Sequence, residues 1–298
     1  MEAVFSPLSG SLRARSSRGE REKRPQRFHA EHNWLRPALL MKLDLNCDLG
    51  EGEPLGRTRA LMRWITSANV ACGGHAGDFT MMESCVRLSK QQDVRLGAHP
   101  GPWSRGDFGR GHIQLTPDEM ESLLLHQVGA LELIAQANGV RLHHIKLHGA
   151  LYHASEEEDA LAKRYVAVVE RFWPRARIYA RARGRVARIA RRGGVVVWEE
   201  AFVDRNYRDD GTLVSRNEPN ALLTGTSVVV ARIRQLLEKG DVTAESGKRI
   251  ALRPQTLCIH SDTPRAVQLA RVVAKELYKF SKSANAGRNT TRRIRGRV

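Results

Sequence analysis

Short runs typical of β-strands alternate with longer runs that have the apolar spacing of amphipathic helices, from Met41 to about Tyr278. Repeated strand–helix units of this kind predict a parallel sheet covered by helices. The strands are expected near residues 41–48, 66–72, 94–99, 143–149, 177–181, 195–202 and 256–262. The helices are expected near residues 56–64, 79–91, 117–138, 158–172, 184–192, 227–239 and 264–279.

Polar residues at the strand ends decide between a closed barrel and an open sheet. In a barrel nearly every strand delivers a polar residue to one common mouth, whereas an open sheet collects its ligands at a single crevice. At least six of the seven expected strands end in polar groups, namely Asp44, Asn46 and Asp48, then Asn69, His99, Lys146 and His148, Glu200, and finally His260 and Asp262. The chain is therefore predicted to fold as an α/β protein, a seven-stranded TIM-like (β/α) barrel.

The alternation of side chains along a strand predicts that the barrel interior is polar. Successive strand residues point to opposite faces, so Asp44, Asn46 and Asp48 share one face while the apolar residues between them share the other. The same parity groups Lys146 with His148, and it groups His260 with Asp262. If the apolar faces meet the helices, the polar faces meet inside the barrel.

A gathering of ionisable groups inside a barrel is costly unless ion pairs, a ligand or a metal compensate it, and such gatherings are typical of active sites. For one polar residue such as Asn46, a structural role is as good an interpretation as a catalytic one. The functional interpretation rests on one group taken together: Asp48, His75, His99, Lys146, His148, His260 and Asp262. The strand cysteines, including Cys258, are interpreted as small buried apolar residues.

Two loops add candidates for binding. Residues 71–78 form a glycine-rich turn that enters a helix and can bring backbone N–H groups and His75 close to an anion. Residues 200–216 include Arg205 and Arg216, whose guanidinium groups suit the forked recognition of a carboxylate.

The basic charge of the chain lies mainly at its two ends. Of the formal charge of +17, residues 1–40 carry +4 and residues 279–298 carry +7, which leaves +6 for the middle. We expect a disordered basic extension over 1–40, a catalytic domain over 41–278 and a basic tail over 279–298. Nucleic-acid binding is therefore disfavoured, although a non-catalytic basic scaffold or nucleic-acid binder that acts through the two ends is kept as a third interpretation. No apolar run is long enough to span a bilayer, and the four cysteines show no paired spacing, which favours the cytoplasm.

Several long motifs, in order, carry a resemblance to a known family. They are LDLNCDLGE (43–51), SANVACGGHAGD (67–78), GAHP (97–100), KLHGALY (146–152), EAFVDRNY (200–207), DGTLV (210–214) and CIHSDTP (258–264). Over roughly residues 41–278 the sequence resembles the LamB/YcsF family, whose members are also described as the A component of 5-oxoprolinase.

This resemblance implies a barrel similar in shape to glycoside hydrolase and deacetylase barrels. It also implies an enzyme that acts with partner subunits B and C to convert 5-oxoproline to L-glutamate with ATP hydrolysis. The sequence contains no G-x-x-x-x-G-K-[ST] loop. If ATP is used, either the partners activate the lactam or the barrel binds the nucleotide by a route that the sequence does not signal.

Opening a lactam needs activated water, a polarised carbonyl and a proton for the departing nitrogen. The working assignment gives Asp48 or His148 the role of general base. Lys146 stabilises negative charge, and His99 or His260 donates the proton. The residues expected to bind substrate are Asp44, Asn46, Glu51, Asn69, His75, Glu200, Asp204, Arg205, Arg216 and Asp262.

A second interpretation comes from a different reaction class. Asp48, His75 and His260 form a candidate trio for a divalent ion, as in a metal-dependent deacetylase or amidohydrolase acting on a carbohydrate or another small amide. Metal analysis and a test of ATP dependence separate it from the first interpretation.

Overall fold

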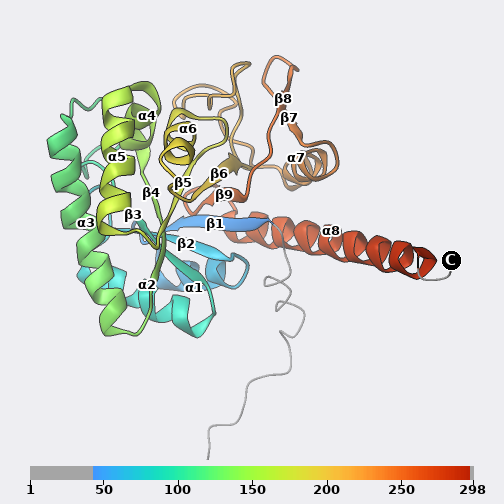
Figure 1. Ribbon diagram of the computed structural model, residues 1–298, viewed down its shortest axis with the longest axis horizontal. Coiled ribbons are helices and arrows are strands. Elements are labelled where there is room, and N and C mark those ends of the chain that lie inside the picture. Colours follow the sequence, from blue (N-terminus) through green and yellow to red (C-terminus); the bar gives the residue numbers. More distant parts are fainter. Residues whose placement is uncertain (1–42, 296–298) are drawn as a thin grey trace, which may run out of the picture. The chain divides into compact units, whose positions relative to one another are not determined.

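Seven parallel strands form a closed barrel, as the alternating pattern predicts (Figure 1). The computed structural model describes residues 43–295, with side chains to residue 283. The barrel order is β1-β2-β3-β4-β5-β6-β9, so β9 closes the ring between β6 and β1. The barrel strands are β1 (Asp44–Leu49), β2 (Ser67–Ala71), β3 (Arg95–His99), β4 (Leu142–Lys146), β5 (Arg177–Arg181), β6 (Val197–Phe202) and β9 (Thr256–His260).

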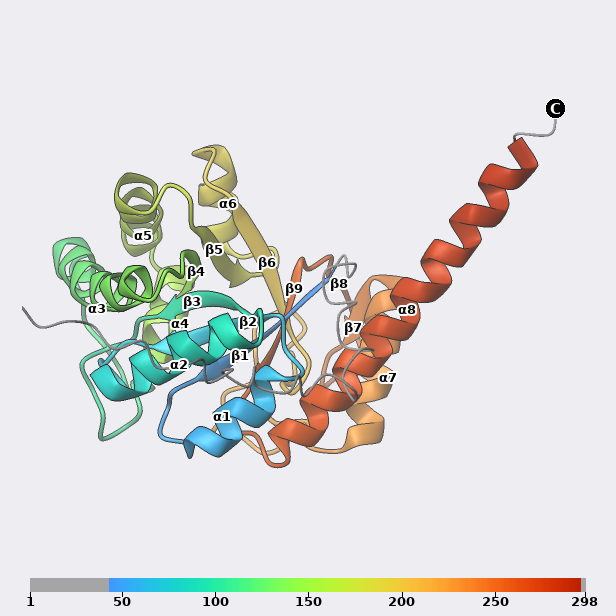
Figure 2. The same ribbon diagram turned by 90° about the horizontal axis from the view of Figure 1, so that it is seen from below.

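Helices surround the barrel and cover the apolar faces of its strands (Figure 1). They are α1 (Leu55–Met62), α2 (Phe79–Gln91), α3 (Pro117–Ala137), α4 (Gly149–Glu157), α5 (Asp159–Phe172), α6 (Arg185–Arg192), α7 (Thr226–Lys239) and α8 (Ala266–Arg295). Figure 2 shows α8 beside α1 and α7. The start of α3 is a capping box, in which Thr116 Oγ1 accepts the Glu119 N–H and Glu119 Oε2 accepts the Thr116 N–H.

Five elements differ from the sequence expectation, and one of them, helix α4, was not expected at all. Strand β4 ends at Lys146 rather than near residue 149, because Gly149 has a φ of +52° and begins α4, with His148 at the N-cap position. A hairpin of β7 (Asp241–Thr243) and β8 (Arg249–Ala251) was missed, since three-residue strands are too short to show a period. Helix α8 continues past residue 279 to Arg295, through a segment whose basic composition indicated a tail.

The interior of the barrel is polar, as the alternation predicts. Leu45, Cys47 and Leu49 are fully buried in the apolar layer between strands and helices. At the amino-terminal end of the strands, Asp44 accepts hydrogen bonds from Ser67 Oγ (2.7 Å) and Thr256 Oγ1 (2.6 Å). Thr66, Tyr179 and Arg95 also contact this carboxylate. These satisfied contacts fill the end of the barrel away from the polar mouth.

The proposed division into an extension, a barrel domain and a tail remains a prediction. Residues 1–40 lie outside the described part of the chain, and the described residues belong to one compact unit. Within residues 43–295, the structure contains no helix with the length and apolar character needed to cross a membrane.

Two neighbouring histidines on β4 predict a loss of stability in mild acid. Burial, with smaller effects from Arg177 and Arg95, lowers the pKa of His143 to about 3, and burial lowers that of His144 well below its ordinary value. In the unfolded chain a histidine titrates near pH 6.5, so the stability that depends on the neutral rings is complete above that pH. This part of the stability is lost progressively as the pH falls toward the lowered pKa values of His143 and His144.

We therefore expect the melting temperature to fall between about pH 6.5 and pH 4. A His143→Gln variant removes one of the two titrations and should show a shallower fall over the same range. Thermal unfolding followed by circular dichroism at a series of pH values measures both slopes. Equal slopes for the two proteins would contradict this account of His143.

Candidate active site

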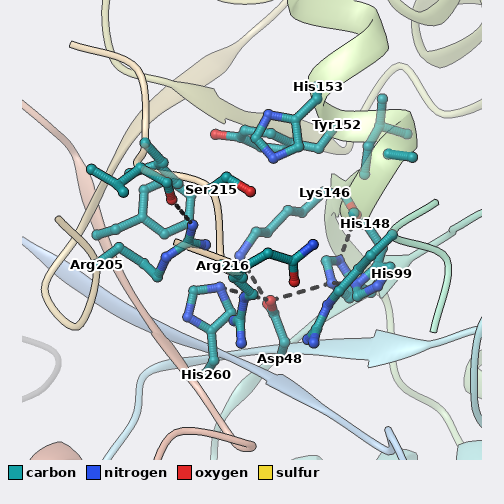
Figure 3. Close-up of a pocket in the computed structure, with 18 residues that line it drawn as sticks. Asp48, His99, Lys146, His148, Tyr152, His153, Arg205, Ser215, Arg216 and His260 are labelled. Atoms are coloured by element: carbon teal, nitrogen blue, oxygen red, sulfur yellow. Dashed lines mark hydrogen bonds and ion pairs between the residues drawn. The ribbon is translucent and has the colours of Figure 1, made fainter. Parts of the chain in front are cut away.

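A cavity of about 310 Å³ lies at the carboxyl ends of the strands (Figure 3). All five residues expected to be catalytic line it: Asp48, His99, Lys146, His148 and His260. They come from β1, β3, β4, the start of α4 and β9, so parallel strand ends and the loop that follows β4 bring them together. The segment after β6 contributes Arg205 and Arg216 to the same cavity.

Lys146 occupies the centre of a buried charge network. Its Nζ lies 2.8 Å from Asp48 Oδ1, 3.2 Å from Glu200 Oε1 and 3.0 Å from Cys258 Sγ. Burial lowers the pKa of Lys146, but the charge of Asp48 and those of the other neighbours outweigh it, and the net pKa lies well above the ordinary value. Lys146 is therefore an ammonium held by two acids.

Asp48 is a carboxylate with separate roles for its two oxygens. Oδ1 accepts from Asn69 Nδ2 at 2.6 Å and from Lys146, while Oδ2 lies 3.3 Å from His99 Nε2 and 3.8 Å from His260 Nε2. Burial raises the pKa of Asp48, but the charges of His99 and Lys146 dominate and hold it well below its ordinary range. Burial outweighs Lys146 at Glu200 and raises the pKa of that carboxyl. Asp48 therefore ionises more readily than Glu200.

His260 is oriented by Asp204 directly behind it. His260 Nδ1 lies 3.1 Å from both carboxylate oxygens of Asp204, which also accepts the backbone N–H of His260 and the hydroxyl of Thr263. Burial raises the pKa of Asp204, but His260 and the other hydrogen-bond donors lower it to about 2. Asp204 fixes the ring so that Nε2 faces Asp48 and the cavity.

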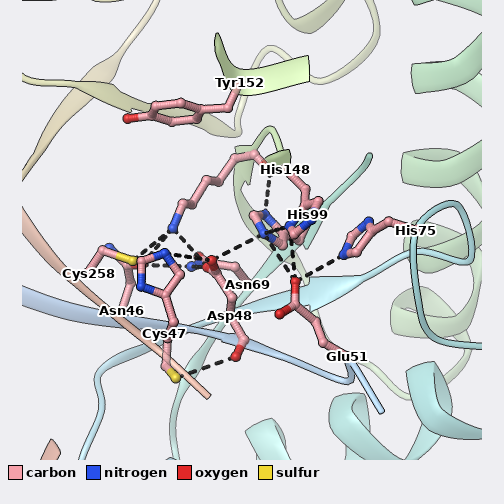
Figure 4. Close-up of polar contacts among 12 residues, drawn as sticks. Asn46, Cys47, Asp48, Glu51, Asn69, His75, His99, His148, Tyr152 and Cys258 are labelled. Carbon is pink, nitrogen blue, oxygen red and sulfur yellow. Dashed lines mark hydrogen bonds and ion pairs between the residues drawn. The ribbon is translucent and has the colours of Figure 1, made fainter. Parts of the chain in front are cut away.

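A second cluster lies beside Asp48 and contains Glu51, His75, His99 and His148 (Figure 4). Glu51 follows β1 through a turn that Glu53 secures, because Glu53 accepts the backbone N–H groups of Gly50 and Glu51. Burial raises the pKa of Glu51, but hydrogen bonds from His148 and His75 lower it far below its ordinary value. This carboxylate is ionised and surrounded by imidazole rings.

Arginines give the cavity a cationic wall. Arg205 is buried, and its Nη2 donates to the Val214 carbonyl, while its Nε has no hydrogen-bond partner among the described residues. Burial and the charge of Arg216 lower the pKa of Arg205 to about 10. Arg110 and Arg216 both bind Asp262 Oδ2, at 2.6 Å and 2.9 Å. With Lys146, four cationic side chains line the cavity against one lining acid, Asp48, which suits an anionic ligand.

Several residues expected to bind substrate lie outside the cavity lining. Asp44 is at the opposite end of β1, about 13 Å from Asp48 at the usual rise of a strand. The remaining seven contact the cavity residues from behind or from the rim, and they are Asn46, Glu51, Asn69, His75, Glu200, Asp204 and Asp262. The expected metal trio is divided, because Asp48 and His260 group with Cys258 while His75 groups with Glu51.

The sequence pattern of one protein family extends over most of this barrel. The model of the LamB/YcsF family matches residues 43–291. The chain belongs to the LamB/YcsF family. Over 240 residues it is 41% identical to the proteins from Pyrococcus furiosus and Pyrococcus horikoshii that are named as the A component of 5-oxoprolinase, which covers 80% of this chain and 94% of each relative.

A solved structure agrees with this assignment. The lactam utilization protein from Thermus thermophilus is 35% identical and superposes with a TM-score of 0.73. The match covers 80% of this chain and 97% of that protein. The likeness extends to nearly the whole of that LamB/YcsF relative rather than to a few strands.

Sequence reasoning missed four residues of this LamB/YcsF site. Cys258 faces Lys146 inside the barrel, and the signal was available, since Cys258 and His260 are two residues apart on one strand. Tyr152 lines the cavity, and its hydroxyl lies 3.4 Å from Glu200 Oε2. Arg110 and Glu53 act through loop conformation, and no periodicity marks them.

Proposed function

We propose that this LamB/YcsF protein is the A component of a multi-subunit 5-oxoprolinase of the cytoplasm, which hydrolyses 5-oxoproline to L-glutamate with ATP. The names of the Pyrococcus relatives support the substrate. The observation that carries the proposal is the cavity itself, which is lined by four cationic side chains and one ionised acid, Asp48. This combination of charges suits the hydrolysis of an anionic amide.

The cavity offers separate places for the two ends of 5-oxoproline. Its carboxylate binds at Arg205 and Arg216, whose guanidinium groups both line the cavity. The lactam ring then lies toward Asp48 and Lys146, which face the same space (Figure 3). This arrangement brings the scissile amide to the most strongly polarised part of the site.

The residues divide the hydrolysis in a definite way. Asp48 takes a proton from water as the water oxygen bonds to the carbonyl carbon. Lys146 stabilises the negative charge on the carbonyl oxygen. His260, held by Asp204, gives a proton to the ring nitrogen as the C–N bond breaks, so the ring opens to glutamate.

ATP enters this proposal through the partners. Subunits B and C transfer the γ-phosphoryl group of ATP to the lactam oxygen, which makes the ring carbon far more electrophilic. In the barrel, one water then adds to the ring carbon and the C–N bond breaks, which gives γ-glutamyl phosphate. A second water cleaves this acyl phosphate to glutamate and phosphate. The absence of a phosphate-binding G-x-x-x-x-G-K-[ST] loop from the sequence supports assigning the phosphorylation to the partners.

An assay with and without partners tests this function. The purified chain is incubated with 5-oxoproline and ATP, alone and with candidate subunits B and C, and glutamate and phosphate are measured. We expect both products only in the complete mixture. If the chain alone released acetate from an acetylated sugar in a metal-dependent reaction without ATP, the second interpretation, a metal-dependent deacetylase, would replace the first. This alternative is supported by the two groups of histidine and acidic side chains beside the cavity, each of which could hold a metal ion.

The Arg205→Gln variant tests the binding of the carboxylate. One charge-assisted hydrogen bond contributes about 1.5–3 kcal/mol, so KM for 5-oxoproline should rise about 10- to 100-fold with a small change in kcat. Arg208→Gln is a matched control, because Arg208 is exposed and pairs with Glu218 outside the cavity. An unchanged KM in the Arg205 variant would place the carboxylate elsewhere.

A further inference from the structure

Four side chains at the ends of four successive strands direct their ligand atoms toward one another. Glu51 and His75 follow β1 and β2, His99 ends β3, and His148 follows β4. Glu51 Oε1 lies 3.0 Å from His75 Nε2, 3.1 Å from His148 Nδ1 and 3.6 Å from His99 Nε2. His99 Nε2 and His148 Nδ1 are 3.1 Å apart, and all four residues are buried (Figure 4).

The outer hydrogen bonds fix which nitrogens carry hydrogen. His99 Nδ1 lies 2.8 Å from the Lys146 carbonyl oxygen, and His148 Nε2 lies 2.9 Å from the Phe108 carbonyl oxygen. A carbonyl only accepts, so both of these nitrogens are donors. In the neutral rings the other nitrogens, His99 Nε2 and His148 Nδ1, then carry lone pairs.

The centre of the cluster is therefore made of acceptors. In the neutral rings the lone pairs of His99 Nε2 and His148 Nδ1 face each other and the carboxylate of Glu51, to which only His75 Nε2 can then donate. A hydrogen bond from His148 to Glu51 forms only when that ring carries an additional proton. Buried acceptors that face one another without a donor are unfavourable. A positive centre among them, either an additional proton or a metal ion, removes the conflict.

We propose that Glu51, His75, His99 and His148 bind one divalent transition-metal ion, with zinc the expected metal. Three imidazole nitrogens and one carboxylate oxygen are borderline ligands that suit zinc and its neighbours better than magnesium or calcium. Metal-binding histidines usually donate their second N–H to a carbonyl or carboxylate, as His99 and His148 do here.

The spacing of the ligand atoms fits a single small ion. Ligands about 2.0–2.1 Å from a tetrahedral zinc ion lie roughly 3.3 Å from one another. Four of the six separations within the cluster run from 3.0 to 3.6 Å, and all of the ligand atoms lie within 4.8 Å of one another. A tetrahedral ion therefore fits among Glu51, His99 and His148, with a movement of His75 to complete it. It would also lie close to Asp48, whose Oδ2 is 3.3 Å from His99 Nε2.

His75 is the ligand that must move most. Its ring stacks on that of His148, with 3.5 Å between centroids and 1° between planes, so their nitrogens lie side by side rather than aimed at one point. His75 Nδ1 has no hydrogen-bond partner among the described residues, so no second bond holds its ring. A Cβ on Gly101 would lie 2.4 Å from this nitrogen, which shows how closely the loop after β3 packs against the ring. Metal binding is expected to turn His75 out of the stack.

Metal titration tests the proposal without any assay of activity, and so does not depend on the proposed function. The full chain is stripped with a chelator, dialysed and titrated with Co²⁺ alone, and binding is followed by visible absorption and by metal analysis. We expect one ion per chain, with a spectrum of tetrahedral nitrogen and oxygen ligation and no thiolate-to-cobalt band. Removal of one ligand in His148→Ala or Glu51→Gln should weaken binding on the order of 100-fold.

Two control variants locate the site. Cys258→Ser alters the neighbouring group of Asp48, Cys258 and His260, and His126→Ala removes an exposed histidine on α3. Both should bind Co²⁺ as the unaltered chain does. If the stripped chain bound no Co²⁺, a proton alone would occupy the cluster and the proposal would be wrong. Loss of binding in Cys258→Ser but not in a correctly folded His148→Ala would also overturn it, by moving the ion to the other group.

Discussion

Replacing Lys146 with Met is expected to lower turnover by about a hundredfold or more while the protein still folds, since it removes one preorganised electrostatic contact. Met keeps most of the side-chain volume and deletes the ammonium that lies between Asp48 and Glu200. In the proposed mechanism this ammonium stabilises the charge on the carbonyl oxygen. Steady-state rates of glutamate formation in the presence of the partners measure the effect.

The same change is expected to reduce stability, which must be separated from the loss of turnover. Breaking a buried ion pair costs about 3–5 kcal/mol when one partner remains charged. Glu200 limits this cost, because burial already raises its pKa and it can take up a proton once Lys146 is absent.

A double variant separates the two effects. The double variant Lys146→Met with Glu200→Gln also removes the Glu200 carboxyl group, so only Asp48 is left as a buried acid that has lost its lysine partner. It should recover much of the stability lost in the single variant. Turnover should remain low, since the ammonium is still missing. If turnover returned together with the melting temperature, Lys146 would hold the barrel together and take no part in the reaction.

The Asp204→Asn variant is expected to lower kcat by about a hundred- to ten-thousandfold with little change in KM. Asp204 does not line the cavity, so it acts on the substrate only through His260. An amide in its place offers a single acceptor oxygen and no negative charge, so it supports the protonated ring of His260 poorly. The loss should therefore fall on kcat, because the ring that donates the proton is no longer held and balanced by a carboxylate.

Thr263→Val provides the matched control for this positioning role. It removes one hydrogen bond to Asp204 and leaves both the carboxylate and His260 in place. We expect a loss of about tenfold or less, in line with one hydrogen bond. A folded Asp204→Asn protein that kept its kcat, or that lost only affinity for the substrate, would contradict the orientation of His260 by Asp204.

The fold was predictable because the deciding signals are local and repeated. The structure shows the alternation predicted for this strand, because the side chains of Asp44, Asn46 and Asp48 all point into the barrel. What local patterns could not supply is where a strand stops. His148 has the parity of an inward residue on β4, but it reaches the site from the N-cap of α4, because the left-handed Gly149 turns the chain.

The sequence predicted which residues gather at the candidate site better than it predicted which of them contact one another. Lys146, Asp48 and Asp262 were expected to gather in one group, and the structure pairs Lys146 with Asp48 and with Glu200. Asp262 lies beyond β9 at the rim and binds two arginines instead. Strand parity does not extend into loops, so the direction of such a side chain depends on tertiary contacts.

The polar contacts at the amino-terminal end of the barrel affect how small molecules enter and leave the cavity. Asp44 and its hydroxyl partners occupy that end, while the cavity lies at the carboxyl ends of the strands, so in the proposed reaction substrate and product share one opening. In that reaction a partner protein that docks over this opening to deliver an activated lactam would also control the departure of glutamate. Docking and release then become competing events, and the rate of partner separation or loop movement sets an upper limit on the turnover of the whole assembly.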